Sequence, residues 1–158
     1  MKTPTLYLDT SVIGGYYDAE WMQDTRELWR QAKEGNWKLL TSVITERELL
    51  AAQLAVRDLF EETFPNAEVL LPETDEADDL AHEYLKAGVV SERYADDAMH
   101  VAICTVQRIN FLVSWNFRHL VNVQREAGFN AVNLLQGYPM VSIVNPKELI
   151  YGITDNEI

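Results

Sequence analysis

Short apolar runs alternate with amphipathic segments along the chain, and this alternation predicts strands separated by helices. The runs expected to form buried strands are residues 5–8, 37–41, 67–71, 111–115 and 140–144. The segments with apolar side chains at helical spacing are residues 24–33, 43–60, 74–87 and 94–108. Thr74 precedes one of these helices as a capping residue, and Gly35 and Gly88 end two of them. The alternation predicts an α/β fold with a central, mainly parallel sheet flanked by helices.

The composition indicates one folded domain without covalent cross-links. Of the 158 residues, 47% are hydrophobic and 10% aromatic, which supplies a core for a single domain over residues 3–150. We expect residues 151–158 to form a short C-terminal tail. Cys104 is the only cysteine, which excludes a disulfide framework and a Cys-rich zinc site. No apolar run reaches the roughly 18 residues of a membrane span and the start lacks a signal-peptide pattern, so we expect no membrane association and a cytoplasmic location.

The net charge is strongly negative and unevenly distributed. The sequence has 13 Lys and Arg against 25 Asp and Glu, a formal charge of −12, which argues against a protein that coats nucleic acid by bulk positive charge. Residues 58–84 contain ten acidic residues and no Lys or Arg, and the rest of the chain is nearly neutral. This stretch is either a solvated helical surface or a surface that docks a basic partner segment.

Four polar positions stand where a parallel sheet would bring them together. Asp9 follows the first strand, Asn116 follows the strand at 111–115, Glu48 lies just past the second strand, and Asp97 begins a helix. Side chains at the carboxyl ends of parallel strands line one crevice. Carboxylates gathered there repel one another, and a divalent cation relieves that repulsion. Oxygen ligands without cysteine favour Mg²⁺ or Mn²⁺ over zinc, although each acid taken singly is also typical of a helix cap.

In their order along the chain, these residues belong to the motifs LYLDTSVI, TSVITERELL, YADDAMHVAIC and LVSWNFRHLV, which VSIVNPKEL follows. These motifs are much more specific together than singly. With them, the sequence resembles PIN domains and, among these, the VapC-type toxins of bacterial toxin–antitoxin pairs. The resemblance implies a three-layer α/β/α fold and a Mg²⁺- or Mn²⁺-dependent endoribonuclease that hydrolyses RNA phosphodiester bonds. It further implies a cognate antitoxin as partner and a homodimer. The resemblance covers nearly the whole chain, from the first of these motifs to VSIVNPKEL.

The resemblance assigns a role to each acid. Asp9 is the first-strand aspartate, Glu48 the family glutamate and Asp97 the third acid, with Asp9 and Asp97 as metal ligands. Glu46 points about 200° away from Glu48 on a helix and cannot share its direction. Asp96 stays open as a competitor of Asp97.

Asn116 departs from the family pattern. It stands where many relatives have aspartate, so the catalytic set of Asp9, Glu48, Asp97 and Asn116 has one negative charge fewer. An amide oxygen still ligates a cation or holds a water. Two hypotheses follow: an active metal-dependent endoribonuclease, or a catalytically degraded PIN-like domain that binds RNA or protein.

Several residues near these motifs have both a substrate-binding and a structural interpretation. We expect Ser11 and Arg118 to contact substrate phosphates, whereas capping of a helix and an exposed loop are the alternatives. Arg93 and His119 have the same two interpretations. His100 lies on the same helical face as Asp97 and either supports the site or is a hydrogen-bonded core histidine. Base stacking by Trp21, Trp29 and Trp37 competes with a core or dimer role.

Overall fold

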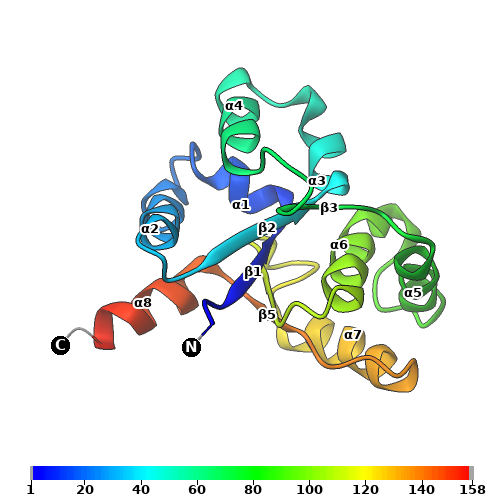
Figure 1. Cartoon of the computed structure of the whole chain (residues 1–158). Helices are drawn as coiled ribbons and strands as arrows, with labels where there is room; N and C mark the ends of the chain where they lie inside the picture. Colours follow the sequence, from blue (N-terminus) through cyan, green and yellow to red (C-terminus); the bar gives the residue numbers. More distant parts are fainter. Residues whose placement is uncertain (1, 157–158) are drawn as a thin grey trace.

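A five-stranded, all-parallel sheet lies at the centre of the computed structural model, which describes residues 2–156 and the side chains of residues 2–152 (Figure 1). The strand order is β3-β2-β1-β4-β5, so the first strand of the chain is the central one. The strands are β1 (Thr5–Leu8), β2 (Lys38–Ser42), β3 (Leu70–Leu71), β4 (Phe111–Val113) and β5 (Ser142–Val144).

Helices connect these strands and cover the sheet. They are α1 (Thr10–Gly15), α2 (Met22–Lys33), α3 (Val43–Glu48), α4 (Leu54–Thr63), α5 (Asp75–Lys86), α6 (Ala95–Val106), α7 (Val123–Leu135) and α8 (Pro146–Asn156). Two short 3₁₀ turns, η1 (Leu49–Ala51) and η2 (Glu92–Tyr94), precede α4 and α6. Asp9, Ser42 and Thr74 cap α1, α3 and α5 with their side chains, so Thr74 has the capping role that the sequence predicts.

Each face of the sheet has its own apolar cluster, because strand side chains alternate between the faces. On β1, Tyr7 belongs to the cluster formed with α5, α6 and α7, whereas Leu6 and Leu8 belong to the cluster formed with α1, α2, α4 and α8. Figure 1 shows these two groups of helices on opposite sides of the strands. The arrangement is the three-layer α/β/α fold that the sequence predicts.

The hydrophobic pattern locates most elements but misses two helices. The expected strands and helices are present with shifted ends, and residues 43–60 divide into α3, η1 and the start of α4. Residues 123–135 and 146–156 form α7 and α8, which the pattern did not predict. The segment expected as a tail, 151–158, therefore begins inside α8 and continues helical to residue 156, while residues 157 and 158 lie outside the described residues.

Local hydrogen bonds explain why α8 forms at this point. The side-chain oxygen of Asn145 accepts from the backbone N–H of Lys147 at 2.8 Å, and Glu148 accepts from the N–H of Asn145 at 2.9 Å. This reciprocal arrangement is a capping box, and Pro146 occupies the first turn, where its missing N–H costs nothing.

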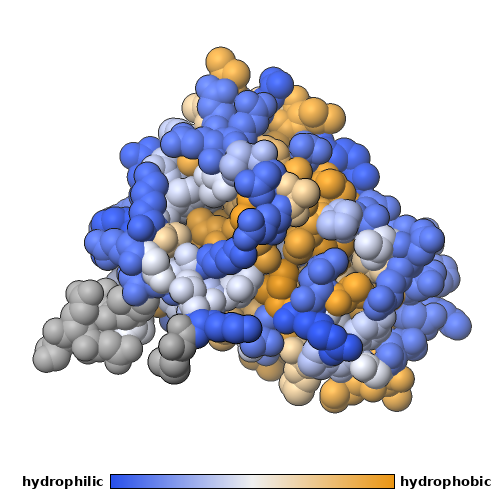
Figure 2. Space-filling view, viewed as in Figure 1, coloured by the Kyte–Doolittle hydropathy of each residue, from blue (hydrophilic) through white to orange (hydrophobic). Residues whose placement is uncertain are grey.

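The surface agrees with a domain whose acids face solvent. All of the acidic residues in 58–84 except Glu83 are exposed. Figure 2 shows hydrophilic side chains over the outer helices, α5 included, and hydrophobic ones towards the middle of this face. This exposure agrees with both interpretations of the acidic stretch, a solvated helical surface and a surface that docks a basic partner segment. No helix within residues 2–156 combines the length and apolarity needed to cross a membrane.

Candidate active site

Asp9 is the most buried carboxylate of the site. It follows β1, caps α1 and is 3% exposed. Its Oδ1 accepts from the Ser11 hydroxyl at 2.6 Å and from the Val12 N–H at 3.3 Å, and its Oδ2 accepts from the Ser114 hydroxyl at 2.6 Å. Burial raises the pKa of Asp9, and the charge of His100 and these hydrogen bonds oppose that rise. The carboxylate is thus held in one orientation by three donors.

Two serines, Ser11 and Ser114, connect Asp9 to the loop after β4. Ser114 is fully buried and accepts from the N–H of Asn116 at 2.9 Å, while Ser11 accepts from the N–H of Trp115 at 2.9 Å. The single hydroxyl proton of Ser11 is donated to Asp9, so its contacts are internal and its expected part in substrate binding stays a prediction. Sequence reasoning missed Ser114, although a lone hydroxyl inside the apolar run FLVSW was a usable signal.

Glu48 ends α3 and is fixed from two sides. Its Oε1 accepts from the Thr10 hydroxyl at 2.7 Å and bonds to Nε2 of His100 at 2.7 Å. Burial acts to raise the pKa of Glu48, but the hydrogen bond and charge of His100, helped by Thr10, leave it below its usual value. Glu48 is therefore an ionised carboxylate at neutral pH. No contact of its Oε2 is present among the described residues.

Behind Glu48, a chain of buried polar groups runs into the core. His100 Nδ1 lies 2.7 Å from the hydroxyl of Tyr7, which lies 2.6 Å from Oγ of Ser42. Burial lowers the pKa of His100, but the hydrogen bond of Glu48 and the charge of Asp9 raise it overall. His100 thus satisfies both of its sequence interpretations, because it is a hydrogen-bonded core histidine and also the residue that holds Glu48.

The two acids at the start of α6 have different surroundings. Asp97 is half-buried, and burial followed by the charges of Asp9 and Glu48 raises its pKa to about 6, against the lowering effect of His100. Asp96 is exposed and lies 3.7 Å from Nη2 of Arg47. The structure therefore groups Asp97, rather than Asp96, electrostatically with Asp9 and Glu48.

Asn116 shapes the loop after β4 instead of contacting the acids. Its Oδ1 accepts from the N–H of His119 at 3.0 Å, which closes a turn over residues 116–119. Within the part of the chain that the structure describes, Asn116 makes no hydrogen bond to Asp9, Glu48 or Asp97. Its place as the fourth catalytic position stays a prediction.

The donor set fits a hard divalent cation of the kind that retains water ligands. Burial is the main cause of the raised pKa of Asp97, and the charges of Asp9 and Glu48 add to it, a contribution that a bound cation would offset. No three His, Cys, Asp or Glu side chains among the described residues are grouped closely enough to form a complete ligand set. Mg²⁺ binds through one or two carboxylates and several waters, whereas catalytic zinc takes three protein ligands. The assignment of Asp9 and Asp97 as ligands of Mg²⁺ or Mn²⁺ stays a prediction.

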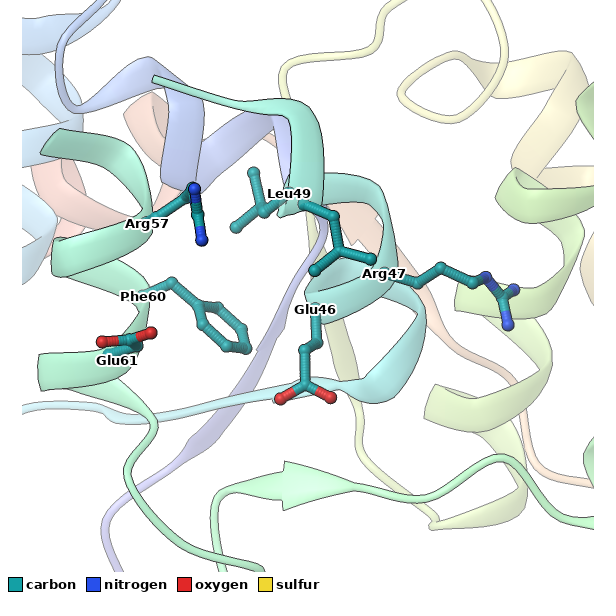
Figure 3. A pocket seen from close by; sticks show the side chains of 7 residues that line it. Glu46, Arg47, Leu49, Arg57, Phe60 and Glu61 are labelled. Atoms are coloured by element: carbon teal, nitrogen blue, oxygen red, sulfur yellow. The ribbon is translucent and has the colours of Figure 1, made fainter. Parts of the chain in front are cut away.

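A neighbouring pocket of about 320 Å³ lies on the other side of α3, against α4. Figure 3 shows Glu46 and Phe60 at this pocket and Arg47 pointing away from it, towards α6. Glu46 and Glu48 thus face different surroundings, as their helical spacing predicts.

Comparison with solved structures identifies the fold. A chain of FitAcB from Neisseria gonorrhoeae matches with a TM-score of 0.56 and 18% identity over 91% of this chain and 99% of that chain. A chain of VapBC2 from Rickettsia felis, bound to a DNA fragment from their promoter, matches with a TM-score of 0.55 and 13% identity over 89% of this chain and 98% of that chain. A chain of FitAB bound to an IR36 DNA fragment matches with a TM-score of 0.55 and 18% identity over 89% of this chain and 94% of that chain. Neither a protein-family model nor a curated protein matches the sequence.

At these identities the likeness is one of fold, and it extends over nearly all of both chains. The molecule is therefore an α/β/α protein with acidic side chains at one edge of its sheet. Its fold is that of the Fit and Vap structures, which confirms the PIN-like fold predicted from the motifs.

Proposed function

We propose that this protein is a Mg²⁺- or Mn²⁺-dependent endoribonuclease and the cytoplasmic toxin of a toxin–antitoxin pair. One arrangement carries the catalytic part of the proposal: Ser11 and Ser114 fix the carboxylate of Asp9, and Thr10 and His100 fix that of Glu48. The charges of both acids also contribute, after burial, to the raised pKa of Asp97. Acidic side chains that influence one another in this way are typical of a cation site that acts on an anionic substrate. The fold shared with the FitAB and VapBC2 structures supports the toxin part.

The residues of the site divide the work between them. Asp9 and Asp97 would hold the cation, which would supply Lewis-acid chemistry at the phosphodiester. Ser11 and Ser114 keep Asp9 in the orientation that ligation needs. Glu48, ionised and fixed through one oxygen, orients the attacking water with the other.

The direct test is cleavage of a pool of structured RNAs in Mg²⁺, in Mn²⁺ and in EDTA. Wild type is compared with Asp97→Asn and with Asp96→Asn, which makes the same change at an exposed neighbour. We expect metal-dependent products from wild type and Asp96→Asn and none from Asp97→Asn. Products that persist in EDTA, or that Asp97→Asn still forms, contradict the proposal.

The partner proposal concerns a small antitoxin encoded beside this chain. A segment with an arginine that reaches the carboxylates of Asp9 and Asp97 would inhibit by charge pairing. Co-expression with the neighbouring reading frame, followed by affinity purification of this chain, should recover the partner in a stable complex. We also expect a homodimer, which light scattering of the purified chain measures. If this chain and the product of the neighbouring reading frame do not co-purify, the toxin assignment falls. The nuclease assignment is not affected by that result.

A degraded PIN-like binding module is the second candidate, because Asn116 carries no charge and its oxygen is used by the turn. Asn116→Asp keeps the acceptor for His119 and restores the acid. If wild type is inactive and Asn116→Asp cleaves RNA, the degraded site is the correct account. Cleavage by wild type excludes it.

A further inference from the structure

Two loops beside the carboxylates bring an aromatic pair together. Tyr94 ends η2, three residues before Asp97, and His119 is held by its N–H to Asn116. Their rings stack with centroids 3.7 Å apart and planes inclined by 30°. The pair therefore joins the start of α6 to the loop after β4. The first segment contributes Asp97, and the second contains Ser114, which donates to Asp9.

Arginines surround this pair. The guanidinium of Arg93 lies 5.8 Å from the centroid of the Tyr94 ring, and Arg118 directly precedes His119. Arg125 donates to the carbonyl of Val89. Burial, followed by the charges of Arg118 and Arg125, lowers the pKa of His119, so both cations lie near the imidazole, which is neutral at pH 7.

These cations have no anionic partner within the described residues. Arg93, Arg118 and Arg125 form no ion pair there, although the chain has 25 acidic residues for 13 basic ones. A guanidinium without an ion pair keeps its charge and its donors available for an anionic ligand. In a chain of net charge −12, such a local cluster is what attracts a polyanion.

One polar atom of the pair also lacks a partner. Nδ1 of His119 is buried and makes no hydrogen bond among the described residues. Buried polar atoms are nearly always hydrogen-bonded in folded proteins, so this nitrogen has room in its hydrogen bonding for a water or for a group that arrives with a ligand. The tryptophans do not offer the same feature: Trp29 is 5% exposed, and Trp21 stacks on Trp115 with centroids 4.3 Å apart.

We propose that Tyr94, His119, Arg93 and Arg118 form a binding site for single-stranded RNA directly beside the carboxylates. A base extends the Tyr94–His119 stack, and the guanidiniums of Arg93 and Arg118 pair with the phosphates on either side of it. The inference rests on the proposed ribonuclease function and specifies where its substrate is held.

The test measures binding rather than cleavage. A fluorescein-labelled single-stranded RNA is titrated by anisotropy in EDTA at several salt concentrations, using the full chain carrying Asp97→Asn. Arg93→Ala and Arg118→Ala should each weaken binding several-fold and reduce the slope of log affinity against log salt by about 0.7. Tyr94→Leu should weaken binding roughly tenfold with the slope unchanged, and Tyr94→Phe should retain the affinity. Arg57→Ala, an equal charge change at an exposed position on α4, should alter neither.

Several outcomes overturn the inference. If Arg57→Ala and Arg118→Ala reduce the slope of log affinity against log salt equally, the RNA is attracted by the overall charge and not by a specific site. Full affinity in Tyr94→Leu removes the stacking role, and if that variant does not fold, the exposed Arg93 and Arg118 carry the test alone. A DNA strand of the same sequence that binds equally well removes the commitment to RNA.

The design separates this inference from the proposed function. If the variants weaken RNA binding as expected while wild type cleaves nothing in Mg²⁺ or Mn²⁺, the RNA site stands and the nuclease assignment falls. If wild type cleaves RNA and the variants bind it as tightly as their Asp97→Asn parent does, the nuclease stands and this site is overturned.

Discussion

At the scale of single residues, two aspartates at the same edge of the sheet are stabilised differently. Asp9 is buried, and the charge of His100 and three hydrogen bonds offset part of its desolvation. Asp97 is less buried, has no hydrogen bond given by the described residues, and has a pKa raised to about 6. The first acid is positioned by the fold, whereas the second has its carboxylate form disfavoured mainly by burial and further by the charges of Asp9 and Glu48.

Replacing Asp97 with Asn should stabilise the metal-free protein at neutral pH. A carboxyl with a folded-state pKa of about 6 and an ordinary value of 3.8 is protonated on folding within that window. The protonated carboxyl contributes fully to the free energy of unfolding below about pH 4. This contribution is lost as the pH rises through about 6. Because solvent screens this partly exposed group, we expect a gain of roughly 1 kcal/mol at pH 7.

Urea unfolding in EDTA at pH 4 and at pH 7 measures this effect, with Asp96→Asn as the matched control. The free energy of unfolding of Asp97→Asn should exceed that of wild type only at pH 7. The gain of Asp96→Asn at pH 7 should be much smaller, because the charge of Asp96 is only a minor cause of the raised pKa of Asp97. An equal gain for both variants would assign the repulsion to the acidic surface as a whole.

Ser114 gives a second prediction. Ser114→Ala removes the donor to Oδ2 of Asp9 and leaves the N–H of Asn116 without its acceptor. Since both partners are at least partly buried, we expect a loss of about 1–3 kcal/mol in the free energy of unfolding. Urea titration checks it against Ser142→Ala, an exposed serine on β5 that should cost little. Wild-type stability of Ser114→Ala would show that water replaces the hydroxyl.

At the scale of elements, the sequence predicts where the acids lie but not what holds them. Asp9 and Glu48 were predictable because they follow apolar runs that form β1 and β2. The hydrogen bonds of Thr10 with Glu48 and of Tyr7 with His100 join residues 38 and 93 positions apart, and periodicity carries no information on such pairs. The support of the site therefore came only from the structure.

Helix α7 escaped prediction because its buried face is partly polar. Asn130 and Asn133 are buried, while Leu134 and Leu135 are 61% and 85% exposed, which reverses the usual amphipathic pattern. The buried amides have a structural use: Asn130 accepts from the N–H of Val141 and donates to its carbonyl, both at 2.8 Å. In this way α7 fixes the chain just before β5.

This role predicts a cost for Asn130→Ala that hydrophobicity would not suggest. The substitution leaves the N–H and the carbonyl of Val141 unpaired in a buried position. We expect a loss of about 2–4 kcal/mol in the free energy of unfolding, measured by chemical denaturation. Leu134→Ala, an exposed change on the same helix, should cost less than about 0.5 kcal/mol. A similar small cost for both would mean that α7 does not depend on this bond pair.

At the scale of the whole molecule, charge is separated between two regions. The acids of residues 58–84 lie mainly exposed on α4, α5 and the segment between them, whereas Arg93 and Arg118 flank the Tyr94–His119 pair without an ion pair among the described residues. A uniform negative field would oppose an RNA strand, whereas unpaired guanidiniums attract it locally. The net charge of −12 therefore describes the solvated surface better than it describes the site.

The folded chain as a whole reports whether the acidic site binds a cation, because a ligand that binds only the native state raises the melting temperature. Saturation at about 100 times the dissociation constant stabilises by roughly 2.7 kcal/mol. In a thermal scan with MgCl₂ against KCl of equal ionic strength, we expect a rise for wild type and Asp96→Asn. Asp9→Asn and Asp97→Asn should show none, because each removes a proposed ligand. An equal rise in all four proteins would assign the cation to the exposed acids of residues 58–84, since Mg²⁺ attracted by general charge does not distinguish Asp96 from Asp97.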